Sequence, residues 1–144
     1  RKTEGAALEV KFREKISNIS DLLASVNQYE SARVSKIKDR IKNALVEHVG
    51  ADYDTNRFEQ ELIYYIEKLD INEEKQRLTN HLDYFIKTIE DEKGQGKKLG
   101  FIAQEMGREI NTLGSKSNLA ELQNIVVMMK DELEQIKEQV LNVM

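Results

Sequence analysis

Apolar residues recur every three to four positions along most of the chain, which is the spacing of helices that bury one face. The first run predicts a long helix over roughly residues 2–29, and a second run, after a break near residues 29–31, continues to a stop at Gly50. Residues 52–55 predict a loop with several candidate N-caps, before a third helix over 58–69. Apolar and polar residues rarely alternate with period two, so no strand is expected. The pattern favours an all-α protein.

The second half of the chain predicts further helices in the same way. Asp70 and Glu73 have the spacing of a capping pair, so a fourth helix is expected from Asp70 to about Glu92. The stretch from Glu92 to Lys97 holds two glycines and no apolar residue, which predicts a loop. A fifth helix should follow this loop and stop at Gly114.

The sixth predicted helix has the most regular pattern, with Asn118 and Glu121 as a candidate capping pair. Its apolar residues are spaced alternately by three and four, as in a coiled coil: Leu119, Leu122, Val126, Met129, Leu133, Ile136, Val140 and Val143. Such a seam serves either self-association or packing on the first helix, and we favour the second. We therefore expect one helical domain over residues 1–144, a bundle of five or six helices with long antiparallel N- and C-terminal helices.

Composition narrows the class of protein. The chain has 144 residues, no proline and 33% charged residues, which suits long helices. It has no cysteine, which excludes a disulfide framework and thiolate metal ligands and agrees with a cytoplasmic location. No apolar run is long enough to span a membrane. The net charge of −4 argues against a generally basic coat for nucleic acid, although local basic patches remain compatible with it.

Polar residues on the fourth and fifth predicted helices form candidate chemistry. One row on the fourth helix holds Asp70, Glu74, Arg77 and His81, and the fifth helix carries Glu105 and Glu109 one turn apart. Carboxylates with an occasional histidine suit Mg²⁺ or Mn²⁺, which can polarise a phosphate and lower the pKa of a bound water. The alternative is that these side chains are helix caps and solvated ion pairs.

Two groups of cations are candidate phosphate contacts, although similar residues occur on the surface of any soluble helix. One group lies within ten residues, at Arg33, Lys36, Lys38, Arg40 and Lys42; the other surrounds the predicted glycine-containing loop, at Lys97, Lys98, Arg108 and Lys116. That loop lacks the spacing of a P-loop and a preceding strand, so no nucleotide or other small-molecule cofactor is expected. His48, at a predicted helix end, is interpreted as structural.

Three segments resemble one known family. Residues 96–116, GKKLGFIAQEMGREINTLGSK, are similar to the signature GKKLDFxxQEMNREINTxGSK of the YicC-like (YloC-like) family, in the C-terminal domain of those proteins. Residues 70–82, DINEEKQRLTNHL, resemble its DIxEExxRLxSHL, and residues 4–8 match its EGxxL. The resemblance covers essentially the whole chain, so the N-terminal domain of the family is expected to be missing from it.

The resemblance implies a metal-dependent endoribonuclease that cleaves RNA and assembles as a ring-like homo-oligomer, possibly a hexamer. On this chain it implies that Glu74, His81, Glu105 and Glu109 are catalytic and hold a divalent metal, Mg²⁺ or Mn²⁺. The RNA-binding residues would be Arg77, Lys97, Lys98, Arg108, Lys116, Arg33, Lys36 and Arg40. Three alternatives stay open: a non-catalytic RNA-binding or adaptor module, a helical oligomerisation domain, and a metal-free nuclease with His81 as acid and base.

Two positions depart from the family signature. Gly100 stands where the signature has Asp, and Gly107 stands where it has Asn. Each glycine costs a helix about 1 kcal/mol relative to Ala. These departures bear on activity, through a lost ligand or RNA contact, more than on the fold.

Overall fold

The computed structural model describes residues 2–50, 54–91 and 95–143, and within these ranges it contains helices and no strand. The elements are α1 (Lys2–Ser25), the 3-10 segment η1 (Val26–Tyr29), α2 (Glu30–Val49), α3 (Thr55–Lys68), α4 (Asn72–Glu90), α5 (Gly96–Lys116) and α6 (Ala120–Leu141). The all-α prediction is confirmed. The predicted break between the first two helices is the short segment η1, and Asp54 caps α3 by accepting a hydrogen bond from the backbone N–H of Asn56 at 2.9 Å.

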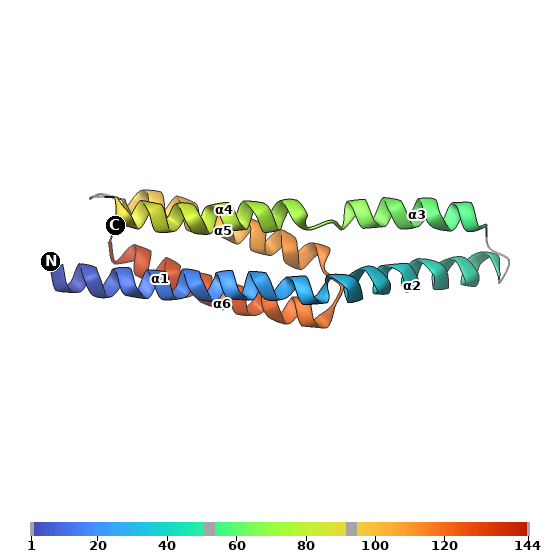
Figure 1. Cartoon of the computed structure of the whole chain (residues 1–144), viewed down its shortest axis with the longest axis horizontal. Helices are drawn as coiled ribbons and strands as arrows, with labels where there is room; N and C mark the ends of the chain where they lie inside the picture. The colour runs from blue at the N-terminus through green and yellow to red at the C-terminus, as the bar shows by residue number, and fades with distance from the viewer. Residues whose placement is uncertain (1, 51–53, 92–94, 144) are drawn as a thin grey trace.

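The helices form two long rods and one shorter hairpin (Figure 1). α1 continues through η1 into α2, and α3 continues into α4 alongside it, running the opposite way. The α5–α6 hairpin packs only against the half that contains α1 and α4. We call α1, α4, α5 and α6 the bundle, and α2 with α3 the arm. α6 runs antiparallel to α1, as the sequence predicted.

The bundle owes its core to the apolar stripes that the sequence shows. Twenty-two buried residues form one cluster contributed by α1, η1, α4, α5 and α6 and by Ile71. The seam of α6 is buried from Leu122 to Val140, while Val143 beyond it is 40% exposed. This seam packs on α1 and on α5, so the expected packing within the chain is confirmed.

The arm has its own, much smaller core. Ile37, Ile41 and Phe58 are its buried apolar residues among those described, with Leu45 and two other leucines packed around them. Two helices alone cannot enclose a large apolar volume, because each helix has only one neighbour to pack against.

Three side-chain contacts lie where the arm meets the bundle, and we call this region the neck. The Arg33 guanidinium, 3% exposed, donates to the carbonyl of Leu69 at 2.8 Å. The Lys75 ammonium donates to the side chain of Asn27 at 2.8 Å, across the two rods. The Lys36 ammonium donates to the carbonyl of Asn118, in the turn between α5 and α6, at 2.6 Å. The neck therefore ties both rods and the α5–α6 turn together.

Several predicted helix ends are wrong. α4 begins at Asn72 rather than Asp70, and Ile71 occupies its N-cap position without a side-chain hydrogen bond. α6 likewise begins at Ala120 with Leu119 at the cap position, so Asn118 is not a cap. In both cases buried apolar packing outweighs capping chemistry, since Ile71 is 1% exposed and Leu119 packs against the bundle core.

The fifth helix also differs from its prediction at both ends. It begins at Gly96, so Lys97 and Lys98 lie in its first turn and not in a loop; residues 92–94 of the predicted loop lie outside the described residues. It continues through Gly114 to Lys116. A Cβ built on Gly114 would lie 3.2 Å from Cγ1 of Val126, so close packing on α6, and not a helix stop, explains the absence of a side chain.

Gly100 and Gly107 lie on this same face of α5, each seven residues from the next glycine. A Cβ on Gly107 would lie 3.3 Å from Cδ2 of Leu133, and a Cβ on Gly100 would lie 3.6 Å from Cγ1 of Val140. The two departures from the family signature therefore face α6, away from the polar residues that α5 presents to α4.

Candidate functional site

The polar row of α4 lies against α5, and Arg77 is at its centre. The Arg77 Nε–H group is shared by the two carboxylate oxygens of Glu109, at 2.8 and 2.9 Å. Its two terminal nitrogens donate to Glu73 at 3.2 Å and to Glu74 at 3.4 Å. The hydrogen bond to Glu109 is the main cause of a raised pKa for Arg77. One guanidinium thus joins three carboxylates from two helices.

A second cation completes this arrangement. The Lys116 ammonium, from the end of α5, donates to both carboxylate oxygens of Glu74 at 3.2 and 3.1 Å. It also donates to the backbone carbonyl of Asp70 at 2.9 Å. Glu74 is 1% exposed, so its charge needs these partners. We call Glu73, Glu74, Arg77, Glu109 and Lys116 the ionic row.

The ionic row fixes how α4 and α5 align. Arg77 meets Glu109, while Glu74 meets Lys116, which is the order of antiparallel helices. One turn further along, this register brings His81 on α4 opposite Glu105 on α5. Both side chains are half-buried. The two helices that carry the predicted site residues therefore face each other.

His81 and Glu105 are less constrained than the ionic row. Glu105 forms an ion pair with Arg108 at 3.6 Å, longer than a hydrogen bond. Within the described part of the chain, His81 makes no ion pair within 4.0 Å. Among the predicted metal ligands, these two side chains are the ones not held by the cations of the ionic row.

The four predicted metal ligands therefore fall into two groups. Both oxygens of Glu74 and of Glu109 accept hydrogen bonds from Lys116 or Arg77, so a metal ion at either carboxylate would compete with a cation that is already bound there. Glu105 and His81 have the donor chemistry for Mg²⁺ or Mn²⁺, which often take few protein ligands and keep several waters. Across residues 2–50, 54–91 and 95–143, no three His, Asp or Glu side chains cluster closely enough to form a metal cage.

The predicted RNA-binding cations are also divided by their contacts. Arg77 and Lys116 are held by carboxylates in the ionic row, and Arg33 is buried in the neck. Lys36 donates to a backbone carbonyl, as described above. The remaining four, Lys97, Lys98, Arg108 and Arg40, are exposed, and the Lys98 ammonium lies 4.9 Å from the ring centre of Tyr84.

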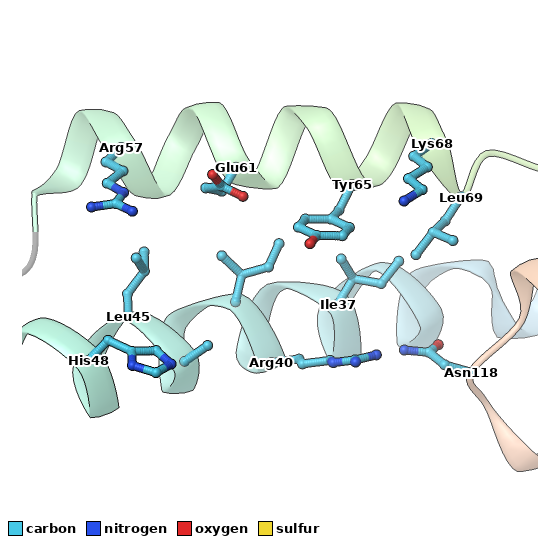
Figure 2. Close-up of a pocket in the computed structure, with 12 residues that line it drawn as sticks. Ile37, Arg40, Leu45, His48, Arg57, Glu61, Tyr65, Lys68, Leu69 and Asn118 are labelled. Atoms are coloured by element: carbon cyan, nitrogen blue, oxygen red, sulfur yellow. The ribbon is translucent and has the colours of Figure 1, made fainter.

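A groove in the arm is the feature that sequence reasoning missed. It encloses about 500 Å³ between α2 and α3 (Figure 2). Of the polar residues that line it, the sequence had pointed to Arg40 as an RNA contact, to His48 as a structural residue and to Asn118 as a helix cap. Arg57, Tyr65 and Lys68 of α3 were not considered. The signal was present, since two adjacent tyrosines precede Lys68 by three and four residues, which places aromatic rings and a cation on one helix face.

Comparison with known proteins was made on the whole chain. A family model described as "Endoribonuclease YicC-like, C-terminal" matches residues 26–144. A protein of Clostridioides difficile named "Probable endoribonuclease YicC" is 32% identical over 145 residues, which cover 99% of this chain and 50% of that protein. A Haemophilus influenzae protein of the same name is 30% identical over 142 residues, covering 99% and 49%. The chain thus spans about half the length of the curated relatives it matches. No helix in the described ranges is long and apolar enough to cross a membrane.

Proposed function

Since this chain belongs to the family of endoribonuclease YicC-like C-terminal domains, we propose that it takes part in the cleavage of RNA phosphodiester bonds and that the α4–α5 face supplies polar groups for it. The observation that carries this proposal is the ionic row, which brings together the two helices that hold the family's densest motifs. Arg77 and Glu109, at 2.8 Å, connect these motifs directly.

Within this face, we assign the chemistry to Glu105 and His81 and a positioning role to the ionic row. Glu105 and His81 have lone pairs available to accept a proton from an attacking oxygen or to bind a divalent cation. A Mg²⁺ or Mn²⁺ ion held there would polarise the phosphate and lower the pKa of a bound water. The ionic row keeps α4 and α5 in the register that sets these two side chains opposite each other. Exposed Arg108, next to Glu105, is placed to neutralise the phosphate.

The test is cleavage of a labelled RNA by the full-length protein with Glu105→Gln or His81→Ala. We expect each variant to lose about 100-fold or more in rate, which is the usual effect of removing a general acid or base. Glu121→Gln, an exposed acid on α6, is the matched control and should cleave like wild type. Thermal melts should show that all three variants stay folded.

The possible outcomes separate the parts of the proposal. Wild-type turnover in Glu105→Gln and His81→Ala would mean that these side chains are only surface groups. If EDTA does not affect cleavage, the proposed metal role is wrong. The roles of Glu105 and His81 are then decided by the activity of their variants alone. RNA binding without cleavage by wild-type protein would favour a non-catalytic RNA-binding module.

We also propose that the protein forms a homo-oligomer, for which a hexamer is the specific expectation. Val127 and Met128 on α6 are 55% and 46% exposed, which leaves adjacent apolar side chains outside the bundle core. Light scattering on the full-length protein measures this directly, and a strict monomer would contradict it.

A further inference from the structure

The groove of the arm combines an apolar floor with a polar rim. Ile37, Ile41, Leu45 and Leu69 lie along its floor, between α2 and α3 (Figure 2). Asn118, from the turn between α5 and α6, lies at the end near Lys68. From Arg57 to Lys68 the wall formed by α3 extends about 16 Å, at the rise of an α-helix. The groove is therefore an elongated channel with room for more than a single small group.

The charge of the rim is strongly biased. Arg40, His48, Arg57 and Lys68 line the groove, and Glu61 is the only acidic residue among the lining residues. All four basic side chains are exposed, and none of them makes an ion pair within 4.0 Å in the described parts of the chain. By contrast, the cations of the ionic row are held by carboxylates. The rim of the groove is thus available to an anion in a way that Arg77 and Lys116 are not.

Aromatic side chains of α3 lie next to Lys68 at the rim of the groove. Tyr65 projects from α3 toward α2 at the groove and is 37% exposed. Its ring meets that of Tyr64 edge to face, with centres 5.2 Å apart, and the Lys68 ammonium lies 5.7 and 5.9 Å from the two ring centres. Proteins bind single-stranded nucleotides with this combination of an accessible aromatic ring and nearby cations that no carboxylate neutralises.

We propose that this groove binds a single-stranded segment of RNA, with an unpaired base against Tyr65 and neighbouring phosphates on Arg57, Arg40 and Lys68. The inference rests on the proposed function for its choice of RNA as ligand. It adds the strandedness of the substrate and a second contact region, separated from Glu105 and His81 by the neck. The base covers the apolar floor and the aromatic ring, while the phosphates meet cations that form no ion pair with any described carboxylate.

Charge and shape select this occupant over others. A duplex keeps its bases stacked and offers none to Tyr65, so it could use only the cations. A helix of a second copy would need acidic residues to match the rim and apolar residues to fill the floor. The ring of Tyr65 and the apolar floor suit the bases of a single strand, and the basic rim suits its phosphates.

The experiment measures binding separately from cleavage. The full-length protein is titrated against a short, unstructured, fluorescein-labelled oligoribonucleotide with 2′-O-methyl groups, and anisotropy is followed over a range of salt concentrations. We expect the double variant Arg57→Gln/Lys68→Gln to reduce the slope of log K against log salt by about 1.4, since each single-strand phosphate contact contributes about 0.7. Tyr65→Ala should weaken binding roughly 5- to 100-fold, which corresponds to the loss of one stacked base.

Two controls make the result specific. Lys87→Gln/Lys130→Gln removes the same charge from exposed positions of the bundle and should leave both the affinity and the slope near wild type. Glu61→Gln removes the one acidic residue of the groove and should tighten binding. A matched duplex should be insensitive to Tyr65→Ala.

Equal binding by the groove variants and the bundle control would overturn the proposal. A change of oligomer mass in Arg57→Gln/Lys68→Gln, with unchanged RNA binding, would also overturn it and would assign the groove to a second copy. Failure of the proposed function has a different signature, because Glu105→Gln would then retain cleavage whatever the binding data show. Circular dichroism of each variant shows whether the arm remains helical.

Discussion

The bundle and the arm are built from the same rods but use their charged side chains in opposite ways. In the bundle, cations such as Arg77 and Lys116 are matched by carboxylates and help to fix helix register. In the arm, Arg57 and Lys68 line an open groove and form no ion pair with a carboxylate among the residues that the structure describes. Among the described residues, twenty-two buried apolar side chains cluster in the bundle and directly next to it, and three cluster in the arm. We therefore expect stability to come mainly from the bundle, where charges are paired, and the proposed RNA binding to use the arm, where they are not.

The largest expected effect is on the bundle core. Phe85 is 0% exposed and packs edge to face on Phe12, with ring centres 5.2 Å apart. Phe85→Ala should lower the free energy of unfolding by about 3–5 kcal/mol, because it removes buried contacts and leaves a cavity. Urea denaturation followed by circular dichroism measures this change. A loss below about 1 kcal/mol would show that the bundle does not carry the stability of the molecule.

A smaller effect is expected from the ionic row. Glu74→Gln removes the charge that faces Lys116 and Arg77, and we expect the free energy of unfolding to fall by about 1–3 kcal/mol. The loss is limited because Lys116 and Arg77 are 29% and 49% exposed and can be solvated. The matched control, Glu121→Gln, should change stability by less than about 0.5 kcal/mol. Equal effects of the two variants would mean that the row adds nothing beyond surface ion pairs.

Phe58→Ala tests whether the arm unfolds on its own. Phe58 belongs to the small arm core, so its loss should open α2 and α3 while the bundle stays folded. We expect the unfolding free energy that hydrogen exchange of the bundle amides reports to fall by less than about 1 kcal/mol. Hydrogen exchange of the arm amides should become faster. Equal loss of protection in α5 and α6 would show instead that arm and bundle unfold as one unit.

The smallest effect concerns the two glycines that face α6. Gly100→Ala should stabilise the protein by up to about 1 kcal/mol, because helix propensity improves and the nearest atom of Val140 is at an ordinary contact distance of 3.6 Å. Gly107→Ala has the same propensity gain, but its new Cβ would lie 3.3 Å from Leu133, so we expect a smaller or opposite change. Thermal melts of the pair provide the comparison, and identical shifts would contradict tight packing at Gly107.

Sequence periodicity predicted the helices well because each one buries a regular apolar stripe. The errors lie at helix ends, where Asp70, Asn118 and Gly114 looked like caps and stops. At those places Ile71 and Leu119 pack on the core, and Gly114 allows α6 to approach. A capping motif states only a local preference, which the packing of distant residues can override.

The candidate site was predictable only in part for a similar reason. Helical spacing placed Glu74 and Arg77 on one face of α4 and Glu109 on α5, and the structure joins them. The sequence could not show that Glu74 and Glu109 are fully engaged by cations, because that depends on the register between two helices. It also could not show the groove, because Arg40 and Tyr65 meet only once α2 and α3 are paired.

The neck has a mechanical consequence. Arg33 and Lys75 form hydrogen bonds between the two rods, and Lys36 forms a third hydrogen bond to the α5–α6 turn. Two helical rods that are joined at two places bend together. A sideways force on the end of the arm should therefore be transmitted to the bundle, and the neck should not act as a hinge. A strand held in the groove would pull on α1 and α4 together, and tension in the RNA would reach α4, the helix that carries His81.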